Sequence, residues 1–123
     1  MRKISTHNAP QAIGAYSQAL VANGFVFTSG QIALTPAGEF AAGGVEDQAR
    51  QVFANIAAVL DASGSGVGKI VKTTLFLVNI ADFEAVNALY AEFLGDHKPA
   101  RSTVAVKELP RNALIEMECV ALI

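Results

Sequence analysis

The chain has 123 residues, of which 52% are hydrophobic and 16% are charged, and its net charge is −2. This length suits a single domain over residues 1–123, and the slightly acidic balance argues against a nucleic-acid-binding protein, which needs a basic surface. No apolar run approaches the ~20 residues that cross a bilayer, and one cysteine excludes an internal disulfide. We therefore expect a cytoplasmic protein without membrane contact, and the low charge predicts that further copies of the chain cover part of its surface.

The first half of the chain predicts a β-hairpin followed by a helix. Residues 17–34 hold two β-rich runs around Asn23 and Gly24, a pair that tolerates the positive φ angles of a tight hairpin turn. From Val45 to Leu60, apolar residues recur every three or four positions, which is the spacing of one helix face.

The second half predicts three strands and another helix. Residues 69–80 are β-branched and aromatic and indicate a central strand, while residues 82–95 carry a helical apolar stripe that ends at Gly95. Two further strands, 101–107 and 114–122, are expected to pair as a second hairpin. The fold class is then α+β, with two helices packed on one face of a mixed sheet and the other face free to meet neighbouring subunits.

Several residues that often carry chemistry are better explained as structural here. "GSGVGK" (64–69) resembles a phosphate-binding loop, but Ser63 stands where that motif needs a glycine. His7 and His97 lie far apart, with no ligand-spaced Cys, Asp or Glu around them, so they make a poor metal site. Cys119 falls on the apolar side of the last strand and is interpreted as a small core residue. The sequence predicts neither a metal nor a cofactor.

Arg101 and Glu116 are charged residues that lie in two otherwise apolar predicted strands. Strand alternation places Arg101 and Thr103 on one face, and it turns Glu116 away from its own apolar neighbours. If the last two strands pair as a hairpin, base and acid can share a face. They then form either an exposed salt bridge worth at most ~1 kcal/mol, or a site in which Arg101 binds a substrate carboxylate and Glu116 handles water or protons.

Four segments in collinear order resemble the RidA (YjgF) family of reactive-intermediate deaminases. They are "AIGAYSQA" (12–19), "FTSGQI" (27–32), "VKTTLFLVNIADFEAVNALYAEF" (71–93) and "KPARSTVAVKELPRNALIEMECVAL" (98–122). The resemblance implies a chorismate-mutase-like fold and a homotrimer with sites between subunits. It also implies cofactor-free hydrolysis of 2-iminobutanoate and 2-iminopropanoate to 2-oxo acids and ammonia. Such imines arise from enamines, for example 2-aminoacrylate, that pyridoxal-phosphate enzymes release.

The same resemblance implies a role for each of five residues. Arg101 binds the substrate carboxylate, Glu116 positions or activates water, and Tyr16 closes over the substrate. Ser29 and Asn87 line the pocket.

Two positions depart from the family pattern, and two other functions compete with deamination. Thr103 stands where many members have cysteine, so we expect this position to bind substrate through its backbone, and Ala15 stands where many have proline. The alternative function is a non-catalytic regulatory module that binds 2-oxo acids in the same cleft, although Glu116 favours catalysis. A ribonuclease activity is disfavoured by the acidic balance.

Overall fold

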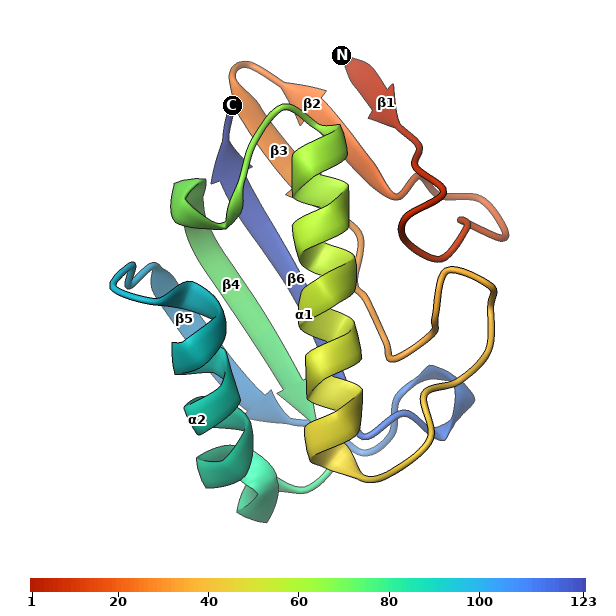
Figure 1. The fold of residues 1–123 in the computed structure, drawn as a ribbon, viewed down its shortest axis with the longest axis vertical. Coiled ribbons are helices and arrows are strands. Elements are labelled where there is room, and N and C mark those ends of the chain that lie inside the picture. Colours follow the sequence, from red (N-terminus) through yellow and green to blue (C-terminus); the bar gives the residue numbers. More distant parts are fainter.

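The computed structural model describes residues 1–123 as one mixed sheet with two helices on one of its faces (Figure 1). The six strands lie in the order β1-β2-β3-β6-β4-β5. The elements in chain order are β1 (Arg2–Ile4), β2 (Ala19–Ala22), β3 (Phe25–Thr28), α1 (Val45–Ala62), β4 (Ile70–Leu77), α2 (Phe83–Leu94), β5 (Ala100–Ala105) and β6 (Ile115–Leu122). The predicted α+β class, the mixed sheet and the placement of both helices are confirmed.

The first hairpin and both helices form where the sequence predicts them. Asn23 and Gly24 connect β2 to β3 with φ angles of 51° and 81°, which is the conformation for which this residue pair is favoured in tight hairpins. Gly95 ends α2 with a φ of 64°, a value that most other residues adopt only with strain. Strand β1 was not predicted; three residues are too few for a pattern, and the strand is held by its pairing with β2.

The predicted second hairpin is wrong. β5 pairs with β4 in parallel and forms an edge of the sheet, whereas β6 lies between β3 and β4 and is antiparallel to both. The cause is α2, which carries the chain back along the sheet, so that β4, α2 and β5 form a βαβ unit. Because β5 is an edge strand, most of its side chains are exposed in the single chain.

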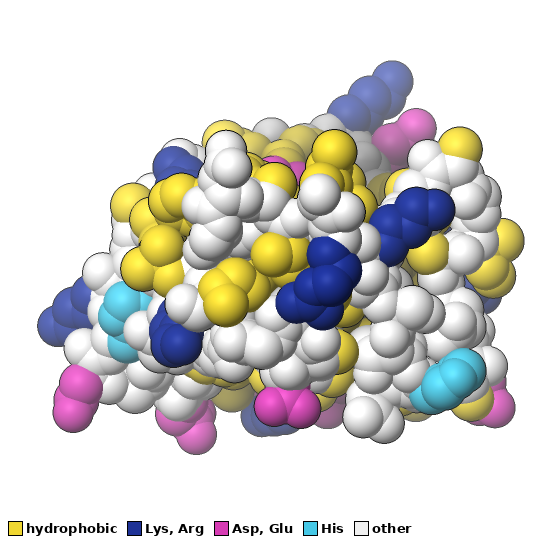
Figure 2. All heavy atoms as spheres, turned by 90° about the horizontal axis from the view of Figure 1, so that it is seen from above, with side chains coloured by type: hydrophobic (Ala, Val, Ile, Leu, Met, Phe, Trp, Pro, Cys, Tyr) yellow, Lys and Arg dark blue, Asp and Glu magenta, His cyan; other side chains and the backbone are white.

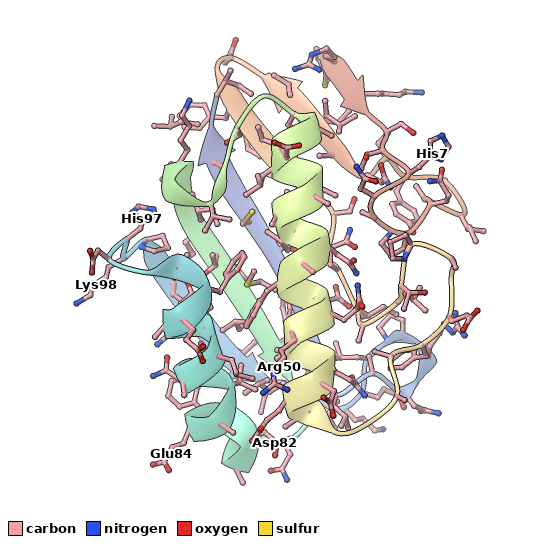
Figure 3. All side chains as sticks on the ribbon, in the orientation of Figure 1. His7, Arg50, Asp82, Glu84, His97 and Lys98 are labelled. Carbon is pink, nitrogen blue, oxygen red and sulfur yellow. The ribbon has the colours of Figure 1, made fainter.

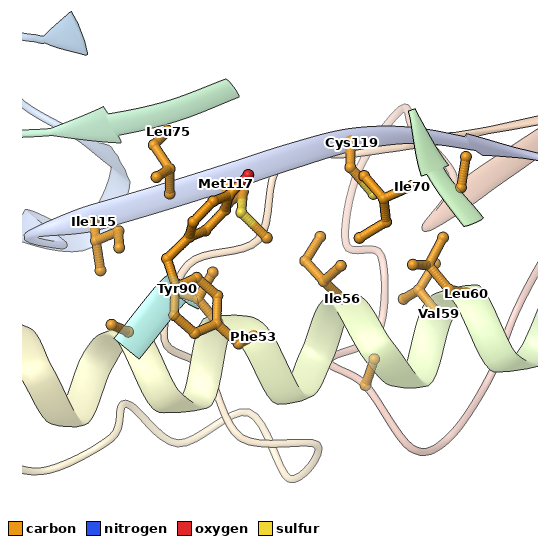
Figure 4. Close-up of a cluster of buried hydrophobic side chains, with 14 of the residues drawn as sticks. Phe53, Ile56, Val59, Leu60, Ile70, Leu75, Tyr90, Ile115, Met117 and Cys119 are labelled. Atoms are coloured by element: carbon orange, nitrogen blue, oxygen red, sulfur yellow. The ribbon is translucent and has the colours of Figure 1, made fainter. Parts of the chain in front are cut away.

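The hydrophobic core lies between the two helices and the central strands (Figure 4). Ile56 and Leu60 of α1 point towards the sheet, from which Met117 of β6 and Ile70 of β4 point back, and all four side chains are buried. Neither helix is long and apolar enough to span a lipid bilayer.

The opposite face of the sheet has no cover within the chain. Large apolar side chains stand exposed there, including Phe27 (47%), Val104 (42%) and Leu122 (45%). This arrangement confirms the prediction that the second sheet face is left open.

Candidate functional site

Arg101 lies on edge strand β5 and its guanidinium is held by α2. Its Nη1 donates a hydrogen bond to Oδ1 of Asn87 at 2.7 Å, and its Cζ lies 5.3 Å from the ring centroid of Phe83 and 4.9 Å from that of Tyr90. No carboxylate forms a salt bridge with Arg101. The one salt bridge of the chain joins Arg50 to Asp47. The positive charge of Arg101 is therefore fixed in place and available to an anion.

The backbone of β5 adds further donors beside this guanidinium. The N–H of Val106 donates to the carbonyl of Leu77 in β4 at 2.8 Å. Along a parallel strand, only every second residue directs its N–H to a given neighbouring strand, and in β5 these are the even-numbered residues. The N–H groups of Arg101 and Thr103 therefore point away from β4, towards the open edge of the sheet. An anion at this edge can meet the guanidinium and backbone donors together.

Thr103 contributes a backbone donor, but its side chain is poorly accommodated. Its Oγ1 is buried and has no hydrogen-bond partner. The residue lines a hollow of about 600 Å³ together with Phe83, Glu84 and Arg101. A buried hydroxyl without a partner lowers stability, because the group loses its hydrogen bonds to water and gains none.

We expect Thr103→Val to raise the free energy of unfolding by about 1 kcal/mol, since valine keeps the shape and removes the unpaired hydroxyl. The matched control is Thr28→Val, because Oγ1 of Thr28 accepts a hydrogen bond from the Cys119 N–H at 3.0 Å. That control should lose about 1 kcal/mol. Both values follow from denaturant unfolding monitored by circular dichroism. Destabilisation by Thr103→Val would show that this hydroxyl has a hydrogen-bond partner in solution.

Glu116 lies on the other face of the sheet from Arg101, so the expectation that they share a face is wrong for a single chain. Arg101 pairs in register with Thr73, whose side chain points at α2 and bonds Tyr90. Glu116 pairs with Phe76, and Phe76 pairs with Val104 of β5. Arg101 and Val104 are three residues apart on one strand and therefore point to opposite faces.

Glu116 belongs to a second hollow, of about 420 Å³, whose lining includes Tyr16 and Ser29. Burial raises the pKa of its carboxyl above the usual value, and the nearby charge of Glu118 adds to the shift. A carboxyl whose pKa moves towards neutrality becomes a better proton acceptor and donor at physiological pH. The predicted site residues thus fall into two groups: Tyr16, Ser29 and Glu116 in one hollow, and Arg101, Thr103 and Asn87 at the β5 edge.

Ser29 and Asn87 support other groups of the candidate site through hydrogen bonds. Ser29 Oγ donates to the carbonyl of Ser17, which ties β3 to the loop that carries the exposed Tyr16. Asn87 orients Arg101 through the hydrogen bond to Nη1. The loop is held further by buried Gln18, whose side-chain amide bonds backbone groups of residues 6, 9 and 10. Hydrogen bonds within the chain therefore hold the loop that carries Tyr16.

Gly30 belongs to the site, although the sequence alone did not indicate it. A Cβ atom on Gly30 would lie 2.9 Å from Cδ of Glu116 and closer still to Oε2. The space that a side chain would take is occupied by the Glu116 carboxylate. The adjacent Gln31 exchanges backbone hydrogen bonds with Met117, which fixes this close approach between the 29–31 segment and β6.

The remaining candidates stay outside the site. Cys119 is buried in the core, and burial raises the pKa of its thiol to about 11, which leaves it protonated and unreactive at neutral pH. His7 lies on the N-terminal loop and His97 beyond the end of α2, on opposite sides of the molecule (Figure 3). No three His, Cys, Asp or Glu side chains come close enough to hold a metal ion.

Comparison with known proteins places this geometry in a family. The family described as Endoribonuclease L-PSP matches residues 6–123. Reactive Intermediate Deaminase A, chloroplastic, of Arabidopsis thaliana is 49% identical over 119 residues, which are 96% of this chain and 64% of that protein. The 2-iminobutanoate/2-iminopropanoate deaminase of Dermatophagoides farinae is 45% identical over 99% of this chain and 96% of its own length. The chain belongs to this family, that of the RidA (YjgF) proteins.

A solved RidA-family structure supports the same assignment. The Rid protein YyfA of Yersinia pestis superimposes with a TM-score of 0.97 at 47% identity, over 99% of this chain and 98% of that chain. The resemblance predicted from the sequence is thereby confirmed. The Arabidopsis relative is named as chloroplastic, so the cytoplasmic location expected for this RidA-family chain stays a prediction.

Proposed function

We propose that the protein is a deaminase that hydrolyses 2-imino acids, such as 2-iminobutanoate and 2-iminopropanoate, to 2-oxo acids and ammonia. The observation that carries the proposal is the state of Arg101, an exposed guanidinium held by aromatic rings and an amide, with no carboxylate in salt-bridge contact with it. Its Nε and Nη2 have no partner in the chain, and this pair of donors matches the two oxygens of a carboxylate. The names of the two deaminase relatives add support.

The complete site in this proposal forms between subunits of a homotrimer. Within one chain, Arg101 and Glu116 lie on opposite faces of the sheet, so one bound substrate cannot reach both. A neighbouring copy that covers the open sheet face can bring its own Arg101 edge to the hollow of Tyr16, Ser29 and Glu116. The exposed Phe27 and its apolar neighbours supply the surface for such a contact.

The proposed reaction needs modest assistance, because a protonated imine is already a strong electrophile. Arg101 holds the carboxylate and fixes the imine carbon in place. Glu116 takes a proton from water as the water oxygen bonds that carbon, which forms a tetrahedral carbinolamine. Glu116 then passes this proton to the nitrogen. As the C–N bond breaks, the carbinolamine hydroxyl gives its remaining proton back to the Glu116 carboxylate and becomes the carbonyl of the 2-oxo acid, and ammonia leaves. General-base help of this kind contributes about 10²–10⁴-fold.

The proposal is tested by measuring the hydrolysis of 2-iminobutanoate that a threonine dehydratase generates in situ. The wild-type protein should accelerate the appearance of ammonia and 2-oxobutanoate above the spontaneous rate. Arg101→Ala should return the rate to the spontaneous value, because it removes the carboxylate anchor. Arg101→Lys should recover only a small part of the activity, since lysine keeps the charge and loses the planar pair of donors. Wild-type rates in Arg101→Ala would refute the assigned role.

The same assay separates catalysis from a non-catalytic 2-oxo acid sensor. Arg101→Ala weakens 2-oxobutanoate binding under both functions, so binding alone does not decide between them. Failure of the wild-type protein to accelerate imine hydrolysis, with 2-oxobutanoate still bound, would favour the sensor. A ribonuclease function is not proposed: the face shown in Figure 2 carries scattered Lys and Arg side chains among hydrophobic ones and no continuous basic patch.

A further inference from the structure

Tyr90 of α2 is a buried aromatic residue that joins the core to the guanidinium of Arg101. Its side chain is 5% exposed, and its ring centroid lies 4.9 Å from Cζ of Arg101. On the other side it packs edge-on against Phe53 of α1, with the ring centroids 6.0 Å apart. Its hydroxyl shares a 2.6 Å hydrogen bond with Oγ1 of Thr73, a residue that is fully buried in β4. The ring therefore has a fixed position between the core and the site.

The manner in which Arg101 is held matters for what it can bind. A carboxylate partner would hold the guanidinium firmly but would also cancel its charge. Aromatic rings and the amide oxygen of Asn87 restrain the guanidinium without neutralising it, because a ring attracts a cation through its quadrupole and carries no net charge. The pKa of Tyr90 is raised by burial, so its phenol stays neutral at physiological pH and adds no negative charge.

We propose that Tyr90, whose ring is packed against Phe53 of the core, is a positioning residue that presents Arg101 to the substrate carboxylate. The ring lies against the guanidinium and Asn87 binds Nη1, which leaves the Nε and Nη2 edge directed at the ligand. The role goes beyond packing, because it sets the orientation of a charged group that the core does not contain. This inference rests on the proposed function for its substrate, but the order of the Arg101 side chain can be measured without any substrate.

The first test measures the order of the Arg101 side chain by the ¹⁵N relaxation of its Nε–H group. Tyr90→Leu keeps an apolar side chain and removes the ring, so the guanidinium should become mobile on the picosecond–nanosecond timescale. Tyr90→Phe keeps the ring and should keep the order. An equally rigid Arg101 in Tyr90→Leu would overturn the proposal, whatever the protein catalyses.

The second test uses steady-state kinetics with enzymatically generated 2-iminobutanoate. Tyr90→Leu should raise KM about tenfold, a change within the range of one cation–π contact, with kcat within about threefold of wild type. Tyr90→Phe should restore KM to within about threefold. An equal loss in Tyr90→Phe and Tyr90→Leu would assign the effect to the hydroxyl and overturn the role of the ring.

The matched control is Phe93→Leu, on the same helix. Phe93 stacks on Phe53 with the ring centroids 4.9 Å apart, and no contact joins it to Arg101. This variant should lower the melting temperature as Tyr90→Leu does and leave both KM and Arg101 order unchanged. A KM increase of similar size in Phe93→Leu would show that any loss of core packing acts on the site.

Absence of imine hydrolysis in the wild type would refute the proposed function, while the relaxation experiment would still decide the role of Tyr90.

Discussion

An equimolar mixture of the Arg101→Ala and Glu116→Ala variants, unfolded and refolded together, should regain about a quarter of the wild-type deaminase activity. Each variant alone should be nearly inactive. A site between subunits takes Arg101 from one chain and Glu116 from its neighbour, and random assembly of a ring places two intact halves together at about one site in four. The measurement is ammonia release from 2-iminobutanoate, and refolded wild type serves as the reference.

Two controls make this result specific for a site shared between subunits. The same variants refolded separately and then combined should stay inactive unless subunits exchange. Wild type refolded with the Arg101→Ala/Glu116→Ala double variant should show about a quarter of wild-type activity for a shared site, against about a half for a site within one chain. A mixture of the single variants that remains as inactive as its components would contradict the shared site.

Gly30→Ala should lower kcat about a hundredfold while the protein stays folded. The added methyl group would occupy the space of the Glu116 carboxylate, and its nearest neighbours are all atoms of that flexible side chain. The carboxylate is therefore expected to move while the backbone stays, and a displacement of about 1 Å in a catalytic group can cost 10²-fold. The measurements are kcat, KM and the melting temperature.

The test of this mechanism is non-additivity. In a Glu116→Ala background the obstructing carboxylate is gone, so Gly30→Ala should cause no further loss of activity. Gly68→Ala is the matched control, because its Cβ would meet nothing within 4 Å and its φ lies outside the left-handed region that disfavours alanine. An additional loss in the double variant would show that Gly30 acts through the backbone of the 29–31 segment instead.

Local patterns predicted most elements of this fold because the physics of each element is local. The Asn23–Gly24 turn follows from positive φ, and the apolar spacing of α1 follows from the helical period. The pairing of β5 was mispredicted for a corresponding reason: residues alternate in the same way in parallel and antiparallel strands, so the pattern of 101–107 carries no information about its partner. The intervening α2 decides that partner.

The residues of the candidate site could be proposed before the fold was known, but their arrangement could not. The residues came from the resemblance to the RidA family. Strand alternation alone predicted that Arg101 and Thr103 point to the same face of their strand. The separation of Arg101 from Glu116 follows from their pairing with Thr73 and Phe76 of β4, which no local pattern reveals. Gly30 and Tyr90 were missed because their roles depend on single close contacts with residues distant in the sequence.

The residues alone were enough to predict an α+β fold and a composition that is rich in apolar residues and poor in charged ones, since composition and periodicity depend only on the residues present. The tertiary structure decided that Arg101 is held uncompensated at one sheet edge while Glu116 occupies a hollow on the other face. The physical reason is that strand order and register set which side chains meet, and both depend on contacts between segments far apart in the chain.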